Sequence, residues 1–273
     1  MVRKNNFGKI MIIMSLIMGA ISLLFMTLAN ERERNNASDV TINIATMKLV
    51  QLDLPKEGDP IAIVETTLGE IRFVLYPQYS PNAVENFISL VESGFYNDTY
   101  VYDSQKGAYS GMGTPKKDGK VEGGLSQSRE HIKRELNQDL WPFRGAVCMV
   151  NNTFERTLKQ RFLGGGTYYC GSRFNILNSV KFTEDFSQQV RESSASPELA
   201  EAFISKGGIP NFSQQMTIIG QTYKGFDVVD ALASLEGKDS GDIRIPDADV
   251  KIISVKIDKY SAEEENPTPV NEK

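Results

Sequence analysis

The chain carries few of the side chains that metal or nucleophilic chemistry requires. It has one histidine, His131, and two cysteines, Cys148 and Cys170, with no Cys-x-x-Cys pair. Zinc sites need three or four such ligands close together. A Ser-His-Asp site would need His131 as its base, and no nucleophile motif surrounds any serine. The glycine run 164–166 lacks a following Lys-Ser/Thr pair and is no phosphate loop, so the residue types predict neither a metal nor a cofactor.

The two cysteines leave two interpretations open. Cys148 and Cys170 could form a disulfide in an exported protein, but their spacing does not show whether their Cβ atoms meet. Alternatively, both are small apolar side chains buried in a core.

The overall composition is that of a globular protein. Of the 273 residues, 40% are hydrophobic and 24% are charged, which is enough to bury a core. The formal net charge of −5 argues against nucleic-acid binding, because nucleic-acid-binding proteins usually carry a basic face.

The N-terminus predicts a membrane anchor. Three basic residues in the tail 1–9 precede the uncharged run 10–29, IMIIMSLIMGAISLLFMTLA, which is long enough to cross a bilayer as a helix. The charged residues 31–34 end this run. Because basic flanks stay in the cytoplasm, we expect a single span in the cell membrane, with the C-terminal domain on the extracytoplasmic side.

A cleavable signal peptide is the alternative to an anchor. The sequence Thr27-Leu28-Ala29 resembles a small-residue cleavage site. Cleavage there would release a secreted protein, whereas the length of the apolar run favours an uncleaved span.

The elements that follow are short. Alternating apolar residues at 61–67 and 71–76 predict a β-hairpin. Ser80 is expected to cap a helix that has Pro81 at its first position and ends at Gly94.

The second half of the chain continues in the same manner. We expect a helix after Ser196, a short strand at 217–221, a helix at 225–232 and a closing strand at 250–257. Many short strands with two or three helices and no βαβ rhythm predict an all-β barrel or an α+β fold.

The order and wording of these segments resemble the cyclophilin-type peptidyl-prolyl cis-trans isomerase family. The similarity is carried by IAIVETTLGEIRFVLYPQYSPNAVENFISLVESGFYNDT (61–99), RGAVCMVNN (144–152), GSRFNI (171–176) and GGIPNFSQQMTIIGQTYKGFDVVDAL (207–232). The resemblance implies a mainly β fold: a closed eight-stranded antiparallel barrel capped by two or three helices and preceded by one N-terminal transmembrane helix. Such a barrel fills its interior with side chains, so the peptide groove lies on its outer surface.

With this resemblance the chain divides into five segments. We expect a cytoplasmic basic tail (1–9), a transmembrane anchor or signal peptide (10–29), a tether with a lead-in strand (30–57), the cyclophilin-like domain (58–258) and a disordered tail (259–273).

The family's reaction is rotation about an X–Pro peptide bond, whose barrier of about 18–20 kcal/mol comes from amide resonance. By resemblance, an arginine donates a hydrogen bond to the prolyl nitrogen as the bond twists, and this favours the twisted state. An apolar pocket holds the proline ring.

This chain departs from the family at the groove. The family's Phe-His-Arg motif corresponds here to Val101, Tyr102 and Asp103. An aspartate cannot donate to the prolyl nitrogen, and its charge has the wrong sign. The family's glutamine falls at Gly111, and a phenylalanine of its proline pocket falls at Asn175.

Other groove positions are partly kept. Met149 and Asn151 match the family, whereas its histidine falls at Met216 and its pocket tryptophan at Asn211. Arg173, on a groove strand by resemblance, is the candidate substitute for the catalytic arginine, since its guanidinium can donate several hydrogen bonds. A surface arginine is the alternative. The peptide-groove candidates are Tyr102, Asp103, Tyr109, Gly111, Met149, Val150, Asn151, Arg173, Asn175, Phe212 and Met216.

Three functions follow from the resemblance and the departures. The first is a peptidyl-prolyl cis-trans isomerase acting on exported polypeptides as they fold, against which the aspartate at position 103 argues. The second is a catalytically inactive module of the cell envelope that binds proline-containing segments or a protein partner. The third is a purely structural envelope domain without peptide affinity.

Overall fold

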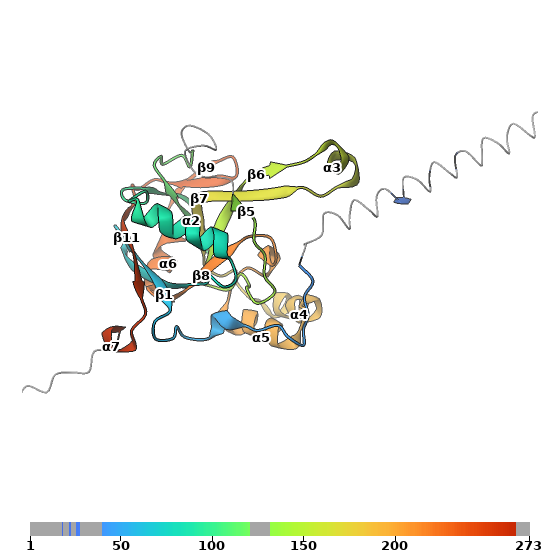
Figure 1. The fold of residues 1–273 in the computed structure, drawn as a ribbon, viewed down its shortest axis with the longest axis horizontal. Helices are drawn as coiled ribbons and strands as arrows, with labels where there is room; N and C mark the ends of the chain where they lie inside the picture. The colour runs from blue at the N-terminus through green and yellow to red at the C-terminus, as the bar shows by residue number, and fades with distance from the viewer. Residues whose placement is uncertain (1–17, 19–21, 23–25, 28–39, 121–131, 266–273) are drawn as a thin grey trace, which may run out of the picture. The chain divides into compact units, whose positions relative to one another are not determined.

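The computed structural model describes residues 40–120 and 132–265, together with residues 18, 22, 26 and 27 (Figure 1). One compact unit comprises residues 39–153 and 168–273, and a second comprises residues 1–38 and 154–167. The predicted cytoplasmic tail, the apolar run and residues 30–39 of the predicted tether lie outside the described residues except at those four positions. Within the described residues, no helix has the length and apolar character needed to span a membrane.

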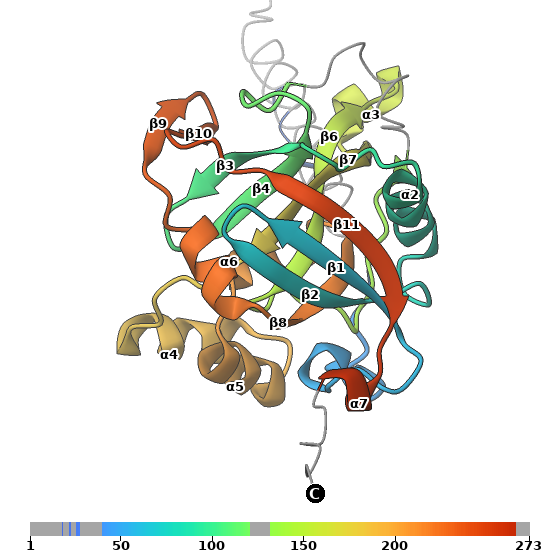
Figure 2. The same ribbon diagram turned by 90° about the vertical axis from the view of Figure 1, so that its left-hand side faces the viewer.

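The larger unit is built around one curled antiparallel sheet. Its strand order is β11-β1-β2-β8-β6-β7-β4-β3 (Figure 2). In addition, β5 pairs with β7. A separate ribbon is formed by β9 and β10. The bounds are β1 Pro60–Thr66, β2 Gly69–Leu75, β3 Tyr100–Gln105, β4 Tyr109–Thr114, β5 Ile132–Lys133, β6 Ala146–Glu155, β7 Thr167–Leu177, β8 Ile218–Lys224, β9 Gly237–Ser240, β10 Ile243–Pro246 and β11 Ile252–Lys259.

The predicted hairpin is confirmed. β1 pairs with β2 so that Val64 faces Ile71, and both side chains are fully buried. Thr66 pairs with Gly69 at the turn. Gly69 has φ +134°, and a Cβ there would lie 2.8 Å from Val228, so the turn needs glycine for both conformation and space.

The closed barrel expected from the resemblance is not present as a continuous ladder in the described residues. β3 and β11, at the two ends of the strand order, meet at an isolated bridge between Tyr100 and Lys251. There Val101 N–H donates to Val250 at 2.9 Å, and Ile252 N–H donates to Thr99 at 2.8 Å. Register shifts within β3 bend this strand after its first residues. The sheet is therefore a half-barrel with a short seam, named here the β3–β11 seam.

Helices precede, connect and follow the strands, and α2 and α6 pack against the sheet. Their bounds are η1 Val50–Leu52, α2 Pro81–Glu92, α3 Leu158–Leu163, α4 Glu184–Ser193, α5 Pro197–Lys206, η3 Pro210–Phe212, α6 Phe226–Leu232 and α7 Ala262–Glu265. α2, α5 and α6 occur where helices were predicted, and α4 was not foreseen. The predicted lead-in strand is wrong, because the described part of residues 40–54 contains the short 3-10 helix η1 and no strand.

The main core lies between α2 and the sheet. Phe87 of α2 contacts Phe73 of β2 and Phe174 of β7, with ring centroids 5.8 and 5.6 Å apart. Tyr96 completes the cluster, and its hydroxyl donates to Ser172 O at 2.7 Å. Replacing one such buried ring by alanine typically costs about 3–5 kcal/mol.

The N-terminal arm, residues 40–57, is tied to the domain by a buried amide. Gln51 donates from Nε2 to Gln221 at 2.9 Å and accepts from Trp141 N–H at 2.5 Å. Because an unsatisfied buried amide is costly, these bonds fix the position of η1.

Both cysteines are free thiols. Cys148 and Cys170 are fully buried, which supports the interpretation as core residues. Burial raises the pKa of both thiols, and that of Cys170 rises to about 12.

Candidate functional site

Three of the predicted groove positions lie side by side on three strands. Asp103 on β3 pairs with Gly111 on β4, and Gly111 pairs with Asn175 on β7. Their neighbours Met112 and Phe174 are fully buried in the main core. Because side chains alternate along a strand, the row Asp103–Gly111–Asn175 belongs to the opposite, outer face, as the resemblance implied.

Asp103 is buried and is not accessible to a ligand in solvent. Only 3% of the residue is exposed. Its Oδ1 accepts from Arg244 N–H of β10 at 2.8 Å and from Gln105 Nε2 at 2.9 Å. Burial raises the pKa of this carboxyl, and the hydrogen bonds from Arg244, Gln105 and Tyr109 only partly oppose that effect. Asp103 therefore anchors the β9–β10 ribbon over β3.

The space at Gly111 is filled by a neighbouring ring. A Cβ at Gly111 would lie 3.0 Å from the ζ carbon of Tyr102 and 3.0 Å from Oδ1 of Asn175. Tyr102 itself is 2% exposed. The ring of Tyr102 thus occupies the place that a larger side chain at position 111 would need.

Arg173 lies over the ring of Tyr102. Its guanidinium carbon is 5.7 Å from the centroid of Tyr102, and Nη1 donates to Gly119 O at 3.0 Å. Burial raises the pKa of Tyr102 to about 12, although the nearby guanidinium acts in the opposite direction. Arg173 precedes Asn175 by two residues on β7, so the two side chains leave the same face of the strand.

Tyr109, Phe212 and Met216 form an apolar cluster, named here the apolar wall. The rings of Tyr109 and Phe212 are tilted with centroids 6.1 Å apart. Met216 is half-buried, and these three residues pack against a second core cluster that includes Leu140 and Ile218. Tyr109, Phe212 and Met216 were predicted as groove residues, and the structure brings them to one cluster.

The remaining positions predicted from the resemblance differ in how far they are exposed. Asn151 on β6 donates from Nδ2 to Gln215 O at 2.9 Å, while Val150 is half-buried. Met149 is fully buried in the main core, so its side chain cannot contact a ligand. Asn211 is exposed.

Comparison with known proteins supports the resemblance to the cyclophilin family. The family model "Cyclophilin type peptidyl-prolyl cis-trans isomerase/CLD" matches residues 61–163. A Staphylococcus saprophyticus protein, named as a peptidyl-prolyl cis-trans isomerase, is 26% identical over 67% of this chain and 86% of its own length. A Streptococcus pyogenes protein whose name joins a phosphatase to a peptidyl-prolyl cis-trans isomerase is 27% identical over 70% of this chain, and the match spans 37% of that relative. These matches support the cyclophilin family for this chain, with the family model matched at residues 61–163.

The fold agrees with that of a solved cyclophilin. A Cryptosporidium parvum cyclophilin-type isomerase, crystallised in the presence of the dipeptide Ala-Pro, matches 73% of this chain and 99% of its own. The TM-score is 0.51 at 20% identity, which supports the fold alone.

Within this cyclophilin fold, three buried side-chain oxygen atoms on β4 and β7 lack hydrogen-bond partners in the described structure. They are Oγ of Ser110, Oγ of Ser172 and Oδ1 of Asn175. Ser110 and Ser172 are fully buried, whereas Asn175 is 8% exposed. Asn175 therefore offers an acceptor for a donor that approaches the outer face of the sheet.

The hydrogen bond from Arg244 N–H that covers Asp103 was not predicted from the sequence. Arg244 is 141 positions from Asp103, and its backbone N–H rather than its side chain makes the contact. Backbone donors carry no residue-type signal. The four-residue strands β9 and β10 also show little periodicity, so only the tertiary structure reveals this neighbour.

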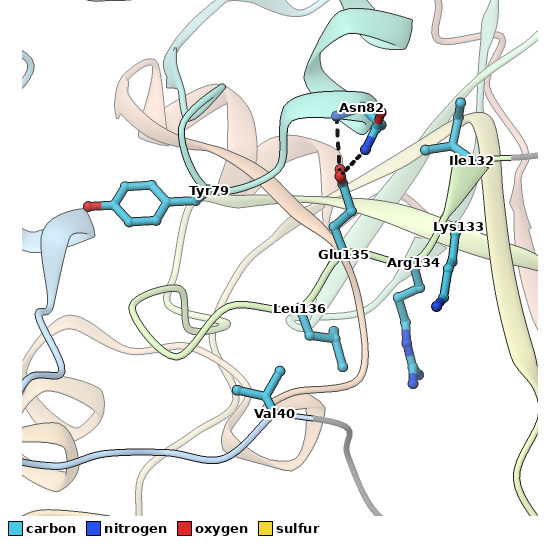
Figure 3. A pocket seen from close by; sticks show the side chains of 8 residues that line it. All are labelled: Val40, Tyr79, Asn82, Ile132, Lys133, Arg134, Glu135 and Leu136. Carbon is cyan, nitrogen blue, oxygen red and sulfur yellow. Dashed lines mark hydrogen bonds between the residues drawn. The ribbon is translucent and has the colours of Figure 1, made fainter.

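Two cavities lie away from the row. One of about 670 Å³ is bordered by the start of α2 and the segment after β5, and Figure 3 shows its lining: Val40, Tyr79, Asn82, Ile132, Lys133, Arg134, Glu135 and Leu136. A second, of about 350 Å³, is lined by parts of the arm, Phe143, Arg144 and β8. Neither cavity includes Asp103, Gly111 or Asn175.

Proposed function

We propose that this cyclophilin-family protein binds proline-containing segments of exported polypeptides and catalyses their cis-trans isomerisation with the guanidinium of Arg173 as the hydrogen-bond donor. The observation that carries the proposal is the position of Arg173. It stacks on Tyr102, whose ring covers Gly111 in the outer row of the groove strands.

The chemistry needs a donor that favours the twisted amide over the planar one. Rotation removes the resonance that holds the amide planar, and the nitrogen lone pair then becomes a better hydrogen-bond acceptor. A guanidinium carries five N–H donors in a fixed fork. Arg173 can therefore keep its bond to Gly119 and still serve a peptide.

Two neighbouring features suit a proline segment. Oδ1 of Asn175 is a buried acceptor that a peptide N–H can satisfy. The apolar wall of Tyr109, Phe212 and Met216 suits a pyrrolidine ring, because it removes apolar surface from water. Export of the substrate rests on the apolar run 10–29, which predicts that the domain lies outside the cytoplasm.

Two-dimensional exchange NMR on an X–Pro peptide tests the activity. The uncatalysed exchange takes tens to hundreds of seconds, so acceleration by the full chain is directly visible. We expect Arg173→Ala to lower the rate on the order of 10²-fold, as removal of one transition-state donor commonly does. The matched control is Arg191→Ala, since Arg191 is paired with Glu201 on the surface of α4 and α5.

A binding module without turnover is the second candidate. It is favoured by the enclosed carboxylate of Asp103 and by the ring of Tyr102 over Gly111. In the same NMR samples it predicts peptide shift changes that Arg173→Ala reduces, with exchange at the enzyme-free rate. If the X–Pro peptide exchanges at the enzyme-free rate in the presence of wild-type protein, the isomerase is excluded. If the peptide also shows no shift changes, both candidates are excluded.

A further inference from the structure

α3 presents two large apolar side chains to solvent. Leu158 is 75% exposed and Phe162 is 76% exposed. Four residues apart on a helix, they lie on the same face. Buried residues are not found in α3, so this face has no core of its own to cover.

Local hydrogen bonds hold the exposed pair in place. Thr157 Oγ1 accepts from Gln160 N–H at 3.3 Å, and Gln160 Oε1 accepts from Thr157 N–H at 2.9 Å, which is a capping box. Arg156 Nε donates to Gly165 O at 3.0 Å and closes the segment behind the helix. Hydrogen bonds within residues 156–165 therefore stabilise the short helix. In this conformation its apolar face is exposed to solvent.

The charge around this face is positive. Residues 154–167 contain three basic residues, Arg156, Lys159 and Arg161, and one acidic residue, Glu155, in a chain whose net charge is −5. At 3.6 residues per turn, Lys159 and Arg161 fall on opposite sides of the face that carries Leu158 and Phe162. The apolar side chains are complementary to a hydrocarbon interior. The cation on each side of them is complementary to anionic groups at its surface.

We propose that α3 docks on an anionic lipid surface. Leu158 and Phe162 enter the region between the headgroups, and Lys159 and Arg161 lie at the lipid phosphates. A stable protein interface buries about 1,000 Å² or more, which two side chains do not provide. A membrane accepts a contact this small when a second attachment holds the chain nearby, and the apolar run 10–29 predicts such an attachment.

The experiment uses the full chain with one reporter residue. The Phe162→Trp variant is mixed with vesicles of brominated phosphatidylglycerol or of brominated phosphatidylcholine. The natural indole of Trp141 is 3% exposed, and the parent protein measures its constant background. Leu54→Trp is the matched control, because Leu54 is 76% exposed but lies in the arm.

The expected result is local to α3. With phosphatidylglycerol, the emission added by Phe162→Trp shifts to shorter wavelength and is quenched, while that added by Leu54→Trp is unchanged. Adding Lys159→Gln and Arg161→Gln to Phe162→Trp removes the quenching, because the attraction to phosphate is lost.

Three outcomes would overturn the proposal. The first is emission from Phe162→Trp that is the same with and without vesicles. The second is equal quenching by the neutral and anionic lipids, which would remove the role of the cations. The third is a shift that appears without vesicles as protein concentration rises, which would assign the apolar face to a second copy of the chain.

Discussion

Asp103 is held by several hydrogen-bond donors and is shielded from solvent. Two of its bonds, from Arg244 N–H and Gln105 Nε2, end on the same oxygen, Oδ1. Asp103 therefore has a structural role, since it ties the β9–β10 ribbon to β3. An amide in its place keeps an Oδ1 acceptor and loses the charge.

We expect Asp103→Asn to change the pH dependence of stability. Burial raises the pKa of the carboxyl in the folded protein, so the folded state binds the proton more tightly than the unfolded state does. The wild-type protein should lose stability relative to Asp103→Asn as pH rises from about 3.9, the ordinary value for aspartate, through the raised pKa. Urea unfolding of both proteins across this range measures the difference. A difference that does not vary with pH would contradict the expectation.

At the scale of the element, the cap of α2 comes from a distant residue. Ser80 occupies the N-cap position but forms no side-chain cap, because its hydroxyl donates to Ile218 O at 2.8 Å. Instead, Glu135 accepts from Ala83 N–H at 2.9 Å. It also accepts from Asn82 Nδ2 at 2.6 Å, and Figure 3 draws this bond. The predicted Ser80 cap is therefore wrong, and its role falls to a carboxylate at the positive end of the helix.

Glu135→Ala should lower the free energy of unfolding by about 1–2 kcal/mol, the usual cost of losing a helix cap. The midpoint of urea unfolding is expected to fall while the slope stays constant. Glu85→Ala, on the exposed surface of the same helix, is the control and should have a smaller effect. Equal losses from the two variants would show that the carboxylate of Glu135 does not act as a cap.

At the scale of the whole molecule, the β3–β11 seam is a short join in the curled sheet. Its two described backbone bonds involve the N–H groups of Val101 and Ile252. The ammonium of Lys251 lies 4.7 Å from the ring centroid of Tyr100 and adds a cation–π contact across the join. The β1–β2 pair, by contrast, continues through six consecutive residue pairs.

Native-state hydrogen exchange should locate this seam. Because local opening needs less free energy where few bonds are broken, the amides of Val101 and Ile252 are expected to exchange before the hydrogen-bonded amides of β1 and β2. Lys251→Ala should accelerate the exchange at the seam and leave the β1–β2 ladder unchanged. Equal protection at both places would indicate a sheet that opens only as one unit.

The sequence alone determined the parts of this protein whose signals are local. The hairpin at 61–76 follows from alternating residues around a glycine turn, and α2 follows from one apolar face after Pro81. The aspartate at position 103, where the resemblance predicts an arginine, is likewise visible in the sequence, because residue identity needs no structure. These features depend on neighbours a few residues away, where periodicity and turn chemistry act.

The tertiary structure decided what lies next to these residues. Glu135 reaches the start of α2 across 52 positions, and Arg244 reaches Asp103 across 141. The ring of Tyr102 over Gly111 and the short β3–β11 seam also depend on how bulges turn β3. Contacts of this kind are set by packing between distant segments, which leaves no periodic pattern in the chain.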